Sequence, residues 1–305
     1  MKVKGYIASI ICLTMLFTGC SNKDNENNTT NNNGTQINTE NEKPNYSKGY
    51  KLIYSNLISK DTQKEVSDKL EKSGVKKEYI YEFIEKVNLY NEKMKEMKGL
   101  EGKFVNVDSP KAPYDEAYAG EKWESFKKIY QDFNCRITAF ELFRDYVESG
   151  SKFTENPPNL MVDLDTIEKN PLSKLNKSEI AKFTNIYAAV PAKDTKNTEE
   201  HVDSIKKELE NRKITFKENN KMSMINIYLH DYDFKELFVG HAGILIEEGD
   251  ELLFVEKYAP TMPYQVSKFK NRKEVYSYLM DRLDVDTTGN ASKPIIMENG
   301  EEMKY

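Results

Sequence analysis

The sequence predicts an α+β fold, in which a helical N-terminal part packs on a small antiparallel sheet. Two observations predict this class. Apolar residues recur at helical spacing through most of the chain before residue 212, and from residue 223 onward they alternate with polar residues as in strands. A run of helices followed by a run of strands is typical of α+β proteins, whereas α/β proteins alternate the two.

The first 20 residues, MKVKGYIASIICLTMLFTGC, have the pattern of an export signal. Two lysines precede an apolar run of about a dozen residues, which is shorter than the ~20 residues of a membrane-spanning helix. The last residues resemble the lipobox of bacterial lipoproteins, in which small residues precede an acceptor cysteine. That resemblance implies cleavage after Gly19 and a lipid on Cys20, on the outer face of the bacterial cell membrane. The alternative is an ordinary signal peptide over residues 1–19 whose following cysteine is accidental.

Residues 20–48 predict a flexible tether, because they are rich in asparagine and bury too little to offset their ordering entropy. The folded domain is then expected to cover residues 49–305, since no second low-complexity linker appears in it. The net charge is −5, and acidic and basic residues are mixed along the chain. This balance argues against nucleic acid as a partner.

The helical part of the domain is predicted from apolar spacing and from breaks in it. The helical period runs over residues 61–98 and is interrupted near Gly74. Further helices are predicted over 120–130, 135–149, 178–189 and 198–212. A last helix is expected to begin at Asn271, which stands in a capping arrangement with Glu274.

The strands are predicted from apolar residues that alternate with other residues. SMINIYLHD (223–231) alternates most clearly, and LFVGHAGILIE (237–247) and ELLFVEKYA (251–259) follow it. Glu248-Gly249-Asp250 is a hairpin signal between the last two. The tail from Asp284 onward is expected to be loop or sheet edge.

Cys135 is the candidate nucleophile. It is the only thiol left in a mature chain, because Cys12 leaves with the signal and Cys20 carries lipid. It stands in the first turn of a predicted helix that Asn134 or Asp132 can cap. Backbone N–H groups at a helix start lower a thiol pKa and can hold an oxyanion, and the neighbouring Arg136 adds positive charge. The alternative is a small buried hydrophobic residue.

His241 is the candidate base. It stands at the beginning of an apolar strand, and the following hairpin returns a polar residue beside it. A turn at 248–249 sets His241 opposite Glu256, and a turn at 249–250 sets it opposite Tyr258. Either register leaves Glu256 on the face of the histidine, where a carboxylate fixes the tautomer and supports imidazolium. The alternative is a strand-end histidine that only hydrogen-bonds locally.

The motifs NCRITAF and GHAGILI together resemble the papain-like thiol hydrolases, and among them the cell-wall amidase and peptidase branch named after the NlpC lipoprotein. The resemblance covers residues 130–260. It implies a papain-like fold, with Cys135 as nucleophile, His241 as base and Glu256 as the residue that orients the base. The chain lacks the Asp-Cys-Ser/Thr-Gly signature of that branch and has a longer cysteine-to-histidine spacing. The whole chain also resembles an uncharacterised lipoprotein family of Gram-positive bacteria, numbered 4300 among domains of unknown function.

Two further residues are candidates for the cleft or for the third member of the triad. Tyr258 and Gln265 lie at the end of the predicted hairpin, on either side of Tyr264 and two prolines. They are expected to line the cleft together with Asn134 and Arg136, or to replace Glu256 beside His241. Ordinary loop packing is the alternative.

The remaining polar groups predict no metal site and no cofactor. His201 is expected to be solvated, since it lies on an amphipathic helix among acids, and His230 has no second ligand at metal-binding spacing. The segment MVDLDTIE offers Asp163 and Asp165 but lacks the glycine and the spacing of a calcium loop.

These observations lead to a lipid-anchored, extracytoplasmic cysteine hydrolase of the peptidase or amidase type. The location favours a cell-wall peptide as the substrate. The alternative is a non-catalytic lipoprotein that binds a ligand or another surface with the same fold.

Overall fold

The computed structural model describes residues 46, 50–126, 133–150, 157–219 and 221–305. The predicted signal at 1–19 lies outside these residues, and so does the predicted tether at 20–48 except residue 46. Cys20, the predicted lipid acceptor, is among the residues not described. Among the described residues, no helix combines the length and the apolar character that crossing a membrane requires.

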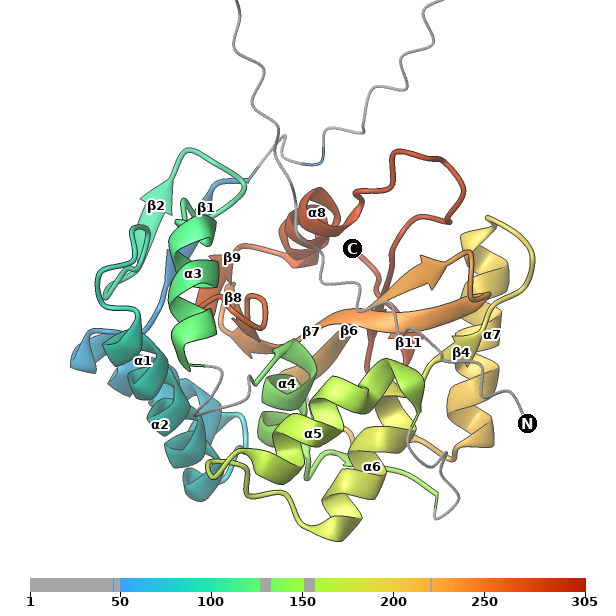
Figure 1. Cartoon of the computed structure of the whole chain (residues 1–305), viewed down its shortest axis with the longest axis horizontal. Coiled ribbons are helices and arrows are strands. Elements are labelled where there is room, and N and C mark those ends of the chain that lie inside the picture. The colour runs from blue at the N-terminus through green and yellow to red at the C-terminus, as the bar shows by residue number, and fades with distance from the viewer. Residues whose placement is uncertain (1–45, 47–49, 127–132, 151–156, 220) are drawn as a thin grey trace, which may run out of the picture. The chain divides into compact units, whose positions relative to one another are not determined.

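Among the described residues before residue 212, most are helical, as the sequence predicts (Figure 1). They are α1 (Lys60–Lys72), α2 (Lys77–Lys93), α3 (Glu116–Phe126), α4 (Cys135–Phe143), α5 (Met161–Lys169), α6 (Lys177–Tyr187) and α7 (Thr198–Asn211), and α8 (Arg272–Leu283) follows later. The predicted break falls at Gly74, whose φ of +96° suits the glycine that ends a helix. Asn271 caps α8 as expected, since its side chain accepts a hydrogen bond from the Glu274 N–H.

The strands form one antiparallel sheet and one short ribbon. The strands are β1 (Leu52–Ser55), β2 (Val105–Val107), β3 (Val147–Glu148), β4 (Val190–Pro191), β5 (Thr215–Phe216), β6 (Met222–Asp231), β7 (Glu236–Glu248), β8 (Glu251–Lys257), β9 (Tyr264–Phe269), β10 (Ile295–Glu298) and β11 (Glu301–Glu302). Among the described residues, nine of them join in the order β11-β10-β6-β7-β8-β9-β1-β2, with β4 added on β7, and β3 pairs with β5. The α+β class is therefore confirmed.

The sheet is larger than the small one predicted, because it recruits segments from both ends of the domain. β1 and β2 extend it beyond β9, and β10 and β11 extend it beyond β6, so the tail after Asp284 does form an edge. Tyr264 and Gln265 belong to β9, a strand that the sequence pattern did not predict. Each of the added strands is short, so its alternation covers too few residues to stand out in the sequence.

One predicted helix ends early. The sequence predicts a helix over 135–149, but α4 stops at Phe143. Val147 and Glu148 pair instead with Phe216 and Thr215 in the β3–β5 ribbon. Val147 is nevertheless fully buried. Its apolar side chain matches the helical period of the sequence, although its backbone belongs to a strand.

The sheet separates two apolar cores, and this division positions the site. On one face, β-strand residues such as Ala242 and Val255 pack in the same core as helices α1, α2, α4, α6 and α7. On the other face, Leu245 and Phe254 pack against α8. Successive strand residues point to opposite faces, so neighbouring residues of β7 and β8 serve different cores.

A substitution at Gly243 of β7 tests this packing. A Cβ atom at Gly243 would lie 2.3 Å from Cζ of Phe254 and 2.9 Å from the carbonyl oxygen of Val255. We expect Gly243→Ala to lower the free energy of unfolding by about 1–3 kcal/mol in urea denaturation, because overpacking forces the ring to move. Gly120→Ala is the matched control. A Cβ there meets no atom within 4 Å, and alanine in a helix is expected to raise stability by about 0.5–1 kcal/mol. Equal midpoints for the two variants would contradict this packing.

Candidate functional site

Cys135 is the first residue of α4, and the start of the helix is built around it. Asn134 is the N-cap residue, and its Oδ1 accepts a hydrogen bond from the Ile137 N–H at 3.0 Å. Thr138 N–H bonds to the carbonyl of Asn134 at 3.0 Å. The N–H groups of Cys135 and Arg136 have no partner within the helix, as at any helix start. The thiol therefore lies at the positive end of the helix dipole.

The thiol contacts the part of β7 that begins with Gly240. Cys135 Sγ lies 4.0 Å from the carbonyl oxygen of Gly240 and accepts a hydrogen bond from the backbone N–H of Ala242. His241, between these two residues, shares a side-chain hydrogen bond with Cys135. The structure thus brings together two residues that are more than a hundred positions apart in the sequence.

A β-bulge occurs at this point in β7. His241 pairs with Ile227 and Val239 pairs with Tyr228, so Gly240 is an extra residue in the ladder. A Cβ on Gly240 would lie 2.3 Å from the Leu229 side chain, so the bulge needs a glycine there. Bulges of this kind aim side chains next to functional sites.

Glu256 completes the chain of contacts. The β7–β8 hairpin turns at residues 249–250, because Glu248 pairs with Glu251 and Gly243 with Glu256. This is the second of the two predicted registers. Glu256 Oε2 lies 2.6 Å from His241 Nε2. Since the ionised carboxylate only accepts hydrogen bonds, Nε2–H donates to it and Nδ1 is left for Cys135.

The Glu256 carboxylate is held by residues from α8 and β9. Its Oε2 also accepts from Arg282 at 2.7 Å, and its Oε1 accepts from the Tyr278 hydroxyl at 2.6 Å and from Gln265 at 3.3 Å. Complete burial raises the pKa of Glu256, but Arg282 and the hydrogen bonds from His241 and Tyr278 outweigh it and bring the pKa to about 2. The carboxylate is therefore ionised at neutral pH.

The charges of the thiol and the imidazole are coupled. Burial raises the pKa of Cys135, but the charge and hydrogen bond of His241, then the charge of Arg136, lower it by more, so that the net direction is down. Burial lowers the pKa of His241, but Cys135 and Glu256 together raise it above its usual value. Both shifts favour a thiolate beside an imidazolium.

Asn134 and Arg136, which the sequence predicts at the cleft, both bind Asp163. Arg136 donates to both carboxylate oxygens of Asp163, at 2.8 and 2.6 Å, and to the carbonyl of Val239 at 2.8 Å. Asn134 Nδ2 donates to the same Asp163 at 2.8 Å. Asp163, from α5, therefore holds the residues on both sides of Cys135, and Arg136 ties them to the β7 bulge. The backbone N–H groups remain the candidates for an oxyanion site.

Tyr258 and Gln265 have supporting positions around the charged pair. The centroid of the half-buried Tyr258 ring lies 3.7 Å from the guanidinium carbon of Arg282. The backbone carbonyl of Tyr258 accepts a hydrogen bond from the same guanidinium. Gln265 is fully buried and accepts from the Tyr114 hydroxyl at 2.7 Å. His241 Nε2–H donates to Glu256, the first of the three predicted partners, rather than to Tyr258 or Gln265.

Three residues that surround the site were not identified from the sequence as part of it. Arg282, Tyr278 and Asp163 are all buried, and each contacts a residue of the Cys135–His241–Glu256 chain or its immediate neighbours. The only sequence signal is that Tyr278 and Arg282 stand four residues apart and so share a helix face. Which strand that face covers is a matter of tertiary packing.

The expectation for His201 is wrong. His201 is fully buried, with its Nε2 2.9 Å from the carbonyl oxygen of Thr195 and its ring 4.6 Å from that of His230. Burial and the neighbouring His230 lower its pKa. Within the described ranges, no group of three or more His, Cys, Asp and Glu side chains is arranged to hold a metal ion.

The site is nearly closed. Cys135 exposes 6% of its surface, His241 3% and Glu256 none. The sulfur is nevertheless surrounded by polar groups of Gly240, His241 and Ala242 rather than by hydrocarbon alone. Such an environment suits a charged thiol better than a structural one.

Comparison with known proteins gives one match. The sequence model of a family described as Domain of unknown function (DUF4300) matches residues 53–303. No curated protein and no solved structure matches the chain.

The depressed pKa of Glu256 predicts how stability depends on pH. The unfolded chain takes up a proton near the ordinary value of 4.5, whereas the native carboxylate resists protonation down to about 2. The stabilisation is therefore complete above 4.5 and is lost as the pH falls from 4.5 towards about 2. We expect Glu256→Gln to flatten the fall in the free energy of unfolding over this window, measured by urea denaturation. Glu302→Gln, at an exposed carboxylate of β11, should keep the wild-type slope; parallel curves for wild type and Glu256→Gln would rule out the linkage.

Proposed function

Because the chain belongs to the DUF4300 family, whose description names no activity, we propose a function from the site itself. The protein is a cysteine hydrolase that cleaves amide bonds, with Cys135 as nucleophile, His241 as general base and acid, and Glu256 as the residue that orients His241. The observation that carries the proposal is the unbroken chain of hydrogen bonds from the thiol through the imidazole to an ionised carboxylate. Thiol catalysis requires a nucleophile within hydrogen-bond reach of a base, and a third group that orients this base.

The steps follow from the positions of the groups. His241 Nδ1 takes the Cys135 proton, and the thiolate attacks the carbonyl carbon of the amide. The backbone N–H groups of Cys135 and Arg136 donate to the oxyanion. The imidazolium then protonates the leaving amine, which leaves a thioester on Sγ. His241 next takes a proton from water as the water oxygen attacks the thioester carbon. The C–S bond then breaks, the acid leaves, and the imidazolium returns the proton to Sγ of Cys135.

We further propose the papain-like, NlpC-type relationship for the fold. A helix that begins with the nucleophilic cysteine packs on an antiparallel sheet, and the histidine and the carboxylate come from neighbouring strands β7 and β8. These features support the relationship. The departures noted in the sequence, above all the missing signature around Cys135, concern the substrate.

The proposed location is the outer face of the bacterial cell membrane, with a lipid on Cys20. The lipobox resemblance and the asparagine-rich stretch after it support this location, and a cell-wall peptide is then the nearest amide substrate. We expect the protein to incorporate labelled palmitate in growing cells and to partition with membranes. Cys20→Ser should abolish both, whereas Cys135→Ser should change neither; labelling that survives Cys20→Ser would refute the anchor.

Thiol reactivity tests the catalytic proposal. At about pH 6 an ordinary thiol is almost entirely protonated, so we expect iodoacetamide to modify native Cys135 at least ~10-fold faster than urea-denatured protein. The product is followed by mass spectrometry of the peptide that contains Cys135. His241→Ala should reduce the native rate to that of the denatured chain, since the thiolate loses its counter-ion. His230→Ala, a histidine outside the site, should leave the rate unchanged.

A non-catalytic binding role is the second candidate, and the 6% exposure of Cys135 favours it. In that case native and denatured protein react equally, and His241→Ala has no effect. The substrate assay completes the comparison. Wild type should release free amine from cell-wall peptides, and Cys135→Ser should release none.

A further inference from the structure

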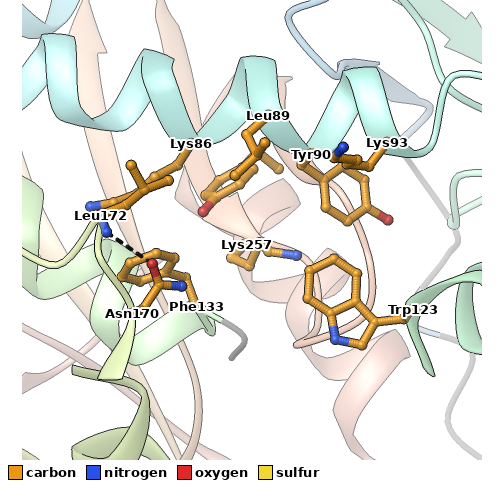
Figure 2. A pocket seen from close by; sticks show the side chains of 10 residues that line it. Lys86, Leu89, Tyr90, Lys93, Trp123, Phe133, Asn170, Leu172 and Lys257 are labelled. Atoms are coloured by element: carbon orange, nitrogen blue, oxygen red, sulfur yellow. Dashed lines mark hydrogen bonds between the residues drawn. The ribbon is translucent and has the colours of Figure 1, made fainter. Parts of the chain in front are cut away.

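The cavity that Phe133 lines beside the start of α4 is too small to receive a ligand. It lies between α2, α3 and the strands β8 and β9 and holds about 40 Å³, which is room for a few water molecules at most. Figure 2 shows Lys257 extending into it between Tyr90 and Trp123, and the Lys257 ammonium donates to carbonyl oxygens of the β8–β9 turn. This space is therefore part of the packing rather than a binding site.

Two of the three histidines of the chain lie outside the candidate site and contact each other. The ring centroids of His201 and His230 are 4.6 Å apart. His201 belongs to α7 and is fully buried, whereas His230 lies near the end of β6 and is half-buried. This His201–His230 pair is a cluster of titratable groups that the proposed hydrolysis does not use.

The hydrogen bonds of the two rings fix the positions of their hydrogens. His201 Nε2 lies 2.9 Å from the carbonyl oxygen of Thr195, which can only accept, so Nε2 carries the hydrogen. His230 Nδ1 accepts a hydrogen bond from the backbone N–H of Ser292 at 3.1 Å, so this nitrogen carries none. His230 is therefore neutral, with its hydrogen on Nε2.

A proton on the remaining nitrogen of either ring breaks the arrangement. Among the described residues, no group lies within hydrogen-bond distance of His201 Nδ1, although this atom is buried. A proton there creates a buried cation without an acceptor, which is costly. A proton on His230 Nδ1 points at the Ser292 N–H and replaces a hydrogen bond with two opposed donors. Both rings must therefore stay neutral for the contacts to hold.

The pair joins three segments that are distant in the sequence. Thr195 belongs to the loop between β4 and α7, His230 to β6, and Ser292 to the segment between α8 and β10. Lys196 of the same loop also donates to the carbonyl of Gly289, so the loop and the segment contact each other directly. None of these contacts involves Cys135, His241 or Glu256, so an inference from them is independent of the proposed hydrolase.

The charged groups that act on the pair come from the β4–α7 loop, from α7 and from the end of β6: Lys193, Asp194, Glu200 and Asp231. Burial is the largest influence on both rings and lowers the pKa of each, and His230 lowers the pKa of His201 further. The carboxylates raise both pKa values. The net direction is nevertheless down from the ordinary value of 6.5 for both rings.

Two further carboxylates lie on neighbouring elements. Glu236 of β7 pairs with Asp231, and burial together with that neighbour raises its pKa above the ordinary 4.5. Burial raises the pKa of Asp286, in the α8–β10 segment, but hydrogen bonds from Thr288 and Ala291 lower it below 3.8. An acid effect above pH 4.5 can therefore come from Glu236 as well as from the histidines, and a variant of both histidines separates the two sources.

We propose that the His201–His230 pair is an acid-sensitive switch, which holds the β4–α7 loop and the α8–β10 segment on the end of β6 while both rings are neutral and releases them when either ring takes up a proton. The unfolded chain takes up these protons near 6.5, whereas the native rings resist them to a lower pH. The stabilisation is therefore complete above 6.5 and is lost as the pH falls below it.

A histidine NMR titration of the wild-type protein tests the first part. Because the chain has only three histidines, single variants assign the ring C–H signals. We expect the signals of His201 and His230 to titrate below 6.5, and that of His241, whose pKa is raised, to titrate above it. Midpoints for both His201 and His230 at or above 6.5 would overturn the switch.

Hydrogen exchange with mass spectrometry tests the release. Exchange is measured at about pH 7.5 and about pH 5 and corrected for the intrinsic rates. We expect peptides that cover residues 192–201 and 286–294 to lose at least ~10-fold in protection on acidification, whereas a peptide from β8 keeps its protection. Equal protection of the first two peptides at both pH values contradicts the proposal.

A double variant assigns the effect to the histidines. His201→Gln with His230→Asn keeps both hydrogen bonds, since the glutamine amide donates in place of Nε2–H and the asparagine oxygen accepts in place of Nδ1, but neither side chain titrates. We expect its protection to be the same at both pH values. Asp203→Asn, at an exposed carboxylate of α7, is the matched control and should keep the acid response. An acid response that persists in the double variant assigns it to a carboxylate such as Glu236 and refutes the switch.

Discussion

The structure depends on one buried negative charge. Glu256 is fully buried, and a carboxylate in such a position is costly unless it is paired and hydrogen-bonded. Here the cost is met by a guanidinium, an imidazole and a phenol, which come from α8 and β7. Removing any of these partners leaves a charge without its compensation. The arrangement of α8 over β7, β8 and β9 is therefore an electrostatic requirement as well as an apolar one.

The thiol depends on a second ion pair on the other side of the sheet. Asp163 binds Arg136 through both oxygens and also accepts from Asn134, so the first turn of α4 is fixed against α5. Arg136 in turn holds the carbonyl of Val239, just before the bulge. One carboxylate thus binds the imidazole of His241, and another fixes the helix start that carries the Cys135 thiol. The Glu256–Arg282 pair lies on the α8 side of the sheet, and the Asp163–Arg136 pair lies on the α5 side. Strand β7 contacts both pairs, through His241 and through the carbonyl of Val239.

Sequence reasoning found the three central residues because their signals are local. A helix-start cysteine and a histidine before an apolar run can be recognised from a few neighbours, although His241 does not begin its strand as predicted, because β7 starts at Glu236. The period of two along β8 put Glu256 on the face of His241 in either hairpin register. The choice between registers was left open, and the turn at 249–250 settles it. Asp163 and Arg282 escaped because nothing in their own segments tells which distant element they contact. The common partner of Asn134 and Arg136 escaped for the same reason, since Asp163 lies on another helix. His201 was misplaced because its side chain turns inward to the Thr195 carbonyl and the His230 ring, which the acidic residues beside it in sequence do not reveal.

The order of the chain has a consequence for biosynthesis. Cys135 acquires its low pKa only when His241 arrives, and the carboxylate behind His241 is stabilised by Arg282, close to the C-terminus. A nascent polypeptide has none of these contacts before its C-terminal part is made. The groups that lower the pKa of its thiol come together only when the last helix docks on the sheet. The electrostatic environment of Cys135 is therefore a property of the completed native state alone.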